Sequence, residues 1–444
     1  MRRVVCLPSS VLLCALAVLW LYGHGASAQQ PSGLKPGQVP INDPGDVLTR
    51  DIASSRRWTV RAQVRLYGAQ PRSRNALNTP ETQAIVFDAC KFIYPQILET
   101  ASSVPYPEDA RFRLQLNRRA PQDRRVTPDR GWPVNENVLT NVYGVIEGYQ
   151  GPTDLMVLEV EEVSATSLLL QVQLDVRTWE TRIDEARADA IEWPTDPWPP
   201  QLVSNLERQL FVEPDHPAIR ELLARFLNGK DPRSVRPYAL AKHLAARVVE
   251  YIEFTDNEYH SVGRGANVAS EQTLLVNGFR VHGAVPMAIT GQGNRLDAPC
   301  LLCALYRAAG LPARLVIGYD ALNPNGFDIS RLPPIRAWVE FALLDDERDV
   351  TEWIPVDISA QRDFSNRAPA LDRTWEHFGL NRDLDFVIPI SHHWHPPTTA
   401  TNDGPPAIWG WRPEPVIPEI DSSITFEAFQ SSVRGDDAVD PYRR

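Results

Sequence analysis

The clearest hydrophobic pattern in the chain lies in residues 291–314, GQGNRLDAPCLLCALYRAAGLPAR. Apolar residues recur there at helical spacing, at Leu296, Cys300, Cys303, Ala304 and Tyr306. The run follows a glycine-rich loop and stops at Gly310, shortly before Pro312. This pattern predicts one buried helix with defined ends.

Strand-like runs follow this helix at residues 314–319, 335–344 and 353–358. Helical patterns precede it at residues 218–227 and 236–254. The acidic residues 345–347 are expected to form a solvated hairpin turn between the last two strands. Together these elements predict an α+β domain over residues 205–395, with a helix packed on an antiparallel sheet.

The region before it, residues 55–195, has the alternating pattern of β-strands. The most regular example is LLLQVQLDVR at residues 168–177, where every second residue is apolar. We therefore expect a β-rich domain of sandwich or barrel type, ending at the Trp- and Pro-rich residues 192–201. It shows no cluster of chemically reactive side chains, so an accessory role in binding or spacing is the default expectation.

The chain begins with two arginines, an apolar run and the small residues Ala26, Ser27 and Ala28. This order predicts a secretion signal over residues 1–28, and an uncleaved membrane anchor is the alternative. The protein is then exported to the periplasm, the cell envelope or the medium. Residues 29–54 are expected to be a linker, and residues 396–444 a Pro-rich arm with one edge strand at 422–429.

The formal net charge of -11 and the 43% hydrophobic content indicate a globular chain that does not bind nucleic acid. Only Cys90, Cys300 and Cys303 lie after the signal, which argues against a disulfide framework. Three histidines, His392, His393 and His395, could suggest a metal site, but a surface loop is the preferred interpretation. No cofactor is predicted.

Several linked motifs follow the central helix pattern in order. They are RAAGLPAR at residues 307–314, GY at 318–319, AWVE at 337–340 and WIPVD at 353–357. In this order and spacing they resemble the core of the transglutaminase-like superfamily, which has a papain-like α+β fold. The resemblance covers about residues 210–395.

The resemblance implies a Cys-His-Asp triad, with the Cys at the start of the central helix. The family's spacing places that Cys at Arg295 and the His at Arg336, so only Asp357 is retained. Arginine is a permanent cation that neither attacks nor accepts a proton. If this registration holds, the acyl-transfer chemistry of the family is absent.

Two interpretations of the arginines stay open. In the first, the site has drifted, and Arg295 is solvated or paired to Asp297. In the second, Arg336 pairs with Asp357 while Arg295 faces the former cleft, making a pocket for anions or carboxylates. The second interpretation would give the protein an acidic peptide, protein or cell-wall polymer as its partner.

The sequence therefore predicts an inactive transglutaminase-like protein that binds a peptide or polymer or acts as a scaffold. An active thiol protease or transglutaminase that uses Cys300 with a displaced histidine is the alternative, and His260 or His282 could approach the cleft. However, Cys300 and Cys303 lie inside the helix pattern, which favours packing over redox or zinc chemistry. A structural spacer in a larger envelope assembly is a third interpretation.

Overall fold

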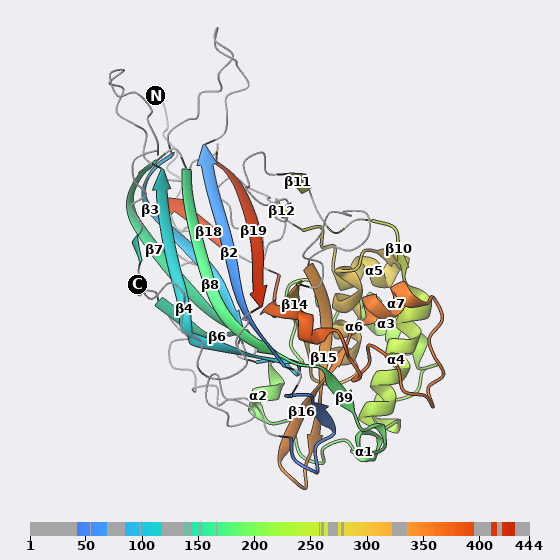
Figure 1. The fold of residues 1–444 in the computed structure, drawn as a ribbon. Helices are drawn as coiled ribbons and strands as arrows, with labels where there is room; N and C mark the ends of the chain where they lie inside the picture. The colour runs from blue at the N-terminus through green and yellow to red at the C-terminus, as the bar shows by residue number, and fades with distance from the viewer. Residues whose placement is uncertain are drawn as a thin grey trace, which may run out of the picture.

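We describe the protein from a computed structural model. The described residues are 42–53, 55–68, 85–97, 99–117, 138–139, 144–150, 153–165, 167–256, 258, 262–264, 274–276, 279–321, 335–394, 410–414 and 420–430. The predicted signal, residues 1–28, lies outside them. Figure 1 shows two lobes, a β lobe of long strands and an α+β lobe in which helices cover a smaller sheet.

The β lobe contains two sheets, with strand orders β11-β12-β19-β2-β8-β4-β5 and β18-β3-β7-β6. Its strands are β2 (Arg56–Gly68), β3 (Ile85–Ile97), β4 (Ser103–Asn117), β5 (Val138–Leu139), β6 (Gly144–Gln150), β7 (Thr153–Ala165), β8 (Ser167–Thr178), β11 (Val262–Arg264), β12 (Leu274–Val276), β18 (Gly410–Glu414) and β19 (Ile420–Gln430). Along β8, Leu168, Leu170 and Val172 are buried, while the residues between them are partly exposed. The alternation predicted from the sequence is therefore confirmed.

The prediction that residues 396–444 form an extended arm is wrong for two segments, which form β18 and β19. Strand β18 pairs with β3, and β19 pairs with β2 along its whole length. The expected edge strand at residues 422–429 exists, but it lies between β2 and β12 and is not an edge. Its backbone groups complete the ladder of a strand more than 350 residues away in the chain, a pairing that local pattern cannot reveal.

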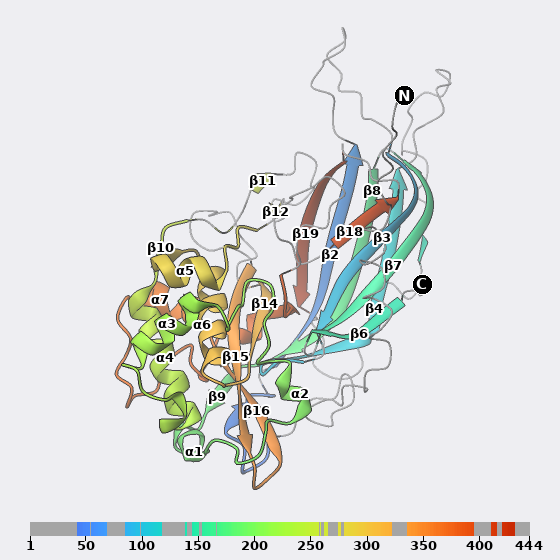
Figure 2. The ribbon, with the colours of Figure 1, turned by 180° about the vertical axis from the view of Figure 1, so that it is seen from behind.

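In the α+β lobe, a four-stranded antiparallel sheet has the order β16-β15-β14-β17. Its main elements are α3 (Pro217–Phe226), α4 (Pro237–Tyr251), α5 (Ala284–Thr290), α6 (Asp297–Ala308), β14 (Ala313–Asp320), β15 (Ile335–Asp345), β16 (Val350–Val356), α7 (Ile358–Phe364) and β17 (Val387–Ser391). Figure 2 shows the helices gathered on one side of this sheet. The predicted order of helix, strand and hairpin is confirmed, and residues 346–349 form the expected turn.

Shorter elements complete the chain: β1 (Leu48–Arg50), β9 (Thr181–Ile183), α1 (Glu185–Ala190), α2 (Pro200–Val203), η1 (Pro232–Ser234), β10 (Glu253–Phe254), β13 (Gln292–Gly293) and η2 (Leu384–Phe386). The linker prediction is wrong at its end, because β1 pairs with β9. Next to it, the backbone N–H groups of Val47 and Leu48 donate to Glu352 at 2.6 and 2.8 Å. Within the described residues, no helix is both long and apolar enough to cross a membrane.

Helix α6 is the centre of the α+β lobe. All of its residues up to Arg307 are buried, because helices α3, α4 and α5 surround it and its remaining face lies on β14 and β15. It ends at Gly310, whose φ of +83° is a conformation that glycine adopts without strain. These ends match the sequence pattern and fix the position of Arg295 just before the first turn.

The two lobes meet at residues 99–103, which we call the docking turn. The backbone N–H of Ala101 donates to the Glu340 carboxylate of β15 at 3.0 Å, and the indole N–H of Trp179 donates to the Ala101 carbonyl. A second link joins Arg56 of β2 to Asp385 at 2.6 Å. These charge-assisted hydrogen bonds hold the two lobes in a specific relative position.

Candidate functional site

The three positions that the resemblance assigns to the triad lie around the first turn of α7. Arg295 precedes α6, Arg336 is the second residue of β15, and Asp357 follows β16 as the N-cap of α7. Asp357 accepts a hydrogen bond from the backbone N–H of Ala360 at 2.8 Å. In the same first turn, the Ser359 hydroxyl donates to the carbonyl of Arg295 at 2.7 Å. The structure therefore brings all three positions to one short helix.

Arg336 lies between two carboxylates. Its Nε donates to Asp357 at 2.5 Å and its Nη1 to Asp383 at 2.7 Å. The Arg336–Asp357 pair that the second interpretation predicted is present. Burial opposes the charge of Arg336, but the two carboxylates outweigh burial and raise its pKa. Likewise, burial would raise the pKa of Asp383, yet the guanidinium outweighs this and lowers it.

Arg295 also binds two carboxylates of the chain. Its Nε and Nη2 donate to both oxygens of Asp363 at 2.8 and 3.0 Å, and its Nη1 donates to Glu258 at 2.9 Å. The guanidinium carbon lies 5.3 Å from the ring centroid of Phe254. Burial acts to lower the pKa of Arg295, but the hydrogen bonds to Asp363 and Glu258 raise it overall.

The predicted pairing of Arg295 with Asp297 is wrong. Asp297 is fully buried, and its carboxylate already accepts hydrogen bonds from the backbone N–H groups of His282, Gly283 and Asn294 at 2.6 to 3.1 Å. The ring Nδ1 of His282 lies 3.2 Å from the same carboxylate and must be its donor. Asp297 thus organises the loop before α6, and its carboxylate is engaged by groups other than Arg295.

His282 is the histidine that the sequence left as a possible displaced base. Its side chain is 50% exposed, and its Nε2 lies 3.8 Å from Asp256. Carboxylates therefore lie near both of its ring nitrogens. His260 lies outside the described residues.

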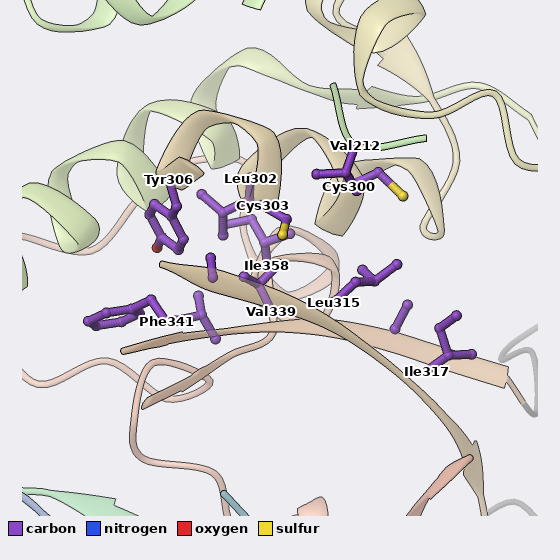
Figure 3. Packing of buried hydrophobic residues seen from close by; sticks show 14 of the residues in the cluster. Val212, Cys300, Leu302, Cys303, Tyr306, Leu315, Ile317, Val339, Phe341 and Ile358 are labelled. Carbon is purple, nitrogen blue, oxygen red and sulfur yellow. The ribbon is translucent and has the colours of Figure 1, made fainter. Parts of the chain in front are cut away.

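Cys300, the alternative nucleophile, is not accessible. It is fully buried in α6, and its thiol donates to the carbonyl of Leu296 at 3.3 Å (Figure 3). Burial, followed by the charge of Asp297, raises its pKa well above the ordinary value. Burial also raises the pKa of Cys303. Both are free thiols packed in the core, as the packing interpretation predicted.

His392 and His393 do not form the predicted surface loop, so that expectation is wrong. Their exposed fractions are 1% and 6%, because the chain turns inward at the end of β17. The His392 ring donates from Nδ1 to the carbonyl of Leu315 at 2.8 Å. Burial, and then the charge of Arg314, hold its pKa well below the ordinary value. His395 lies outside the described residues.

Sequence reasoning missed the acidic partners Glu258, Asp363 and Asp383. They lie between 37 and 68 residues from the arginines that they bind, so no local spacing indicated them. With Asp357 they give four carboxylates for two guanidiniums. The site therefore contains fixed ion pairs and a net negative balance, and neither arginine offers an attacking atom or a proton acceptor.

Part of the chain matches a known protein family. Residues 233–358 match the transglutaminase-like superfamily, so the chain carries a transglutaminase-like domain, as its motifs predicted. The chain is similar to a candidate cysteine protease from Cytophaga hutchinsonii, with 14% identity and a TM-score of 0.46 over 87% of this chain and 94% of that chain. It is also similar to the periplasmic domain of TgpA from Pseudomonas aeruginosa, with 16% identity and a TM-score of 0.26 over 71% and 94%. No curated protein matches it.

Proposed function

We propose that this protein is an exported, non-catalytic transglutaminase-like protein that binds a peptide or polymer or acts as a scaffold. The observation that supports the proposal is that arginines stand at the positions where the resemblance expects the Cys and the His. Arg295 and Arg336 each bind two carboxylates of the chain. Acyl transfer needs a nucleophile and a base in hydrogen-bond reach, and neither residue supplies one.

The alternative enzyme would have to use Cys300. A thiol attacks as its thiolate, which burial in an apolar core disfavours. Cys300 is fully buried and its pKa is raised, so the reactive form is scarce near neutral pH. The half-exposed His282 is held by Asp297 and has no accessible thiol beside it among the described residues.

The charge of the site bears on its ligand. An acidic peptide, as predicted from the sequence, would have to compete with four carboxylates already bound to the arginines. The net negative charge of these partly buried ion pairs would repel a further anion. We therefore propose a neutral or basic peptide or cell-wall polymer in preference to an acidic one. Export itself rests on the pattern of residues 1–28.

Thiol labelling of the native full-length protein tests the absence of catalysis. We expect Cys90, Cys300 and Cys303 to resist an iodoacetamide probe at neutral pH, because all three are buried. The same probe should label them at once in denaturant, which serves as the control. Mass spectrometry then identifies the modified peptides. Labelling of native Cys300 within seconds would show a reactive thiolate. That result would contradict the non-catalytic proposal and favour the alternative, an active thiol enzyme.

A further inference from the structure

His392 lies at the junction between the two lobes. It follows β17, and its ring donates from Nδ1 to the Leu315 carbonyl of β14 at 2.8 Å. Its own carbonyl accepts a hydrogen bond from the Gln209 amide at 3.2 Å. The backbone of Glu99, in the docking turn of the β lobe, also faces the ring. One buried imidazole thus contacts elements of both lobes.

The surroundings of the ring do not balance a positive charge. On β14, Arg314 already carries one, and on β15 its partner Glu340 is saturated. Glu340 binds Nε and Nη2 of Arg314 at 2.8 and 2.6 Å with one oxygen and the backbone of Ala101 with the other. The neighbouring His393 is also buried and would only add positive charge. From the docking turn, the backbone of Glu99 acts to raise the pKa of the ring, but burial and the charge of Arg314 outweigh this effect.

We propose that His392 is an acid-sensitive latch that keeps the docking turn on the α+β lobe at neutral pH and loosens it when protonated. A neutral imidazole has one N–H, and here it is used by Leu315. A second proton would place an imidazolium beside Arg314, whose partner Glu340 is already engaged by that arginine and by Ala101. Proton uptake is therefore favoured when the junction opens and the ring reaches water.

The direction of the pH effect follows from linkage. The folded pKa of His392 lies below its ordinary value, so its contribution to stability is present above the unfolded pKa of about 6.5 and is lost as the pH falls below it. At a pH one unit lower, the opening equilibrium should rise about tenfold. Buried Glu352 acts in the opposite sense, because burial raises its pKa and acid favours its folded form.

Amide hydrogen exchange of the full chain tests the latch. After correction for the intrinsic pH dependence of exchange, we expect opening of residues 99–103, 313–320 and 387–391 to increase about tenfold from pH 7.5 to about pH 5.5. The His392→Asn variant keeps a side-chain N–H for Leu315 and cannot be protonated, so it should lose this increase. The matched control His243→Asn removes an imidazole on α4 and should still show the increase in opening at low pH.

Equal acid sensitivity in the wild type and His392→Asn would overturn the proposal. A measurement on the unmodified protein covers the case in which that variant does not fold. The imidazole C–H resonances of His392, followed by NMR, should stay unchanged over the pH range in which an ordinary histidine titrates. Titration of the ring at the ordinary value in the closed native protein would equally exclude the latch.

Discussion

Replacing Glu340 by glutamine is expected to lower the free energy of unfolding by about 3–5 kcal/mol, because it breaks a buried ion pair on one side only. Glu340 and Arg314 have exposed side-chain fractions of 0% and 2%. The variant leaves the Arg314 guanidinium in the core without its carboxylate. It also weakens the acceptor for the backbone N–H of Ala101, which is the contact that holds the docking turn.

Denaturant unfolding of three variants distinguishes this role from a general loss of charge. Glu347→Gln, on the exposed turn between β15 and β16, should change stability by no more than about 0.5 kcal/mol. A double variant, Arg314→Leu with Glu340→Met, removes both charges and should recover most of the loss. If Glu340→Gln alone lowers the free energy of unfolding by less than about 1 kcal/mol, the Arg314–Glu340 pair does not stabilise the junction between the lobes.

The α+β lobe was predictable because its elements are specified locally. The apolar spacing of residues 291–314 fixed α6 at both ends, and the AWVE and WIPVD motifs gave the strands that present Arg336 and Asp357. The Arg336–Asp357 contact is consistent with this order, because Arg336 lies on β15 and Asp357 directly follows the neighbouring strand β16. Patterns of this kind hold when burial alone decides which face of an element turns inward.

The errors concern contacts between distant segments. The sequence of residues 396–444 predicts only an edge strand at 422–429, but β19 pairs along its length with β2 at the other end of the chain. His392 and His393 look like a polar loop, yet the junction of the lobes buries them. The sequence suggests Asp297 as one possible partner of Arg295. In the structure, the Asp297 carboxylate is already engaged by the loop before α6. In each case a long-range hydrogen bond overrode the local pattern.

Placing Cys and His at the two positions that the resemblance assigns to them is expected to create a reactive thiol, unlike the buried cysteines of the described residues. The Arg295→Cys, Arg336→His double variant places a sulfur at the start of α6 and an imidazole next to the fully buried Asp357. A helix N-terminus and an imidazolium lower a thiol pKa from about 8.5 to about 6 or below. At pH near 6 the thiolate fraction should then rise on the order of a hundredfold over an ordinary cysteine.

The matched control is Arg295→Cys with Arg336→Gln, which has the same new thiol and the same loss of the Arg295 ion pairs but no imidazole. Both variants leave Glu258 and Asp363 without their cation, so thermal melts should show equal destabilisation. Thiolate absorbance as a function of pH then reports the effect of the imidazole alone. If the new thiol titrates as an ordinary cysteine in both variants, Arg295 does not occupy the nucleophile position. The non-catalytic proposal would then lose its basis, because it depends on that position being filled by a cation.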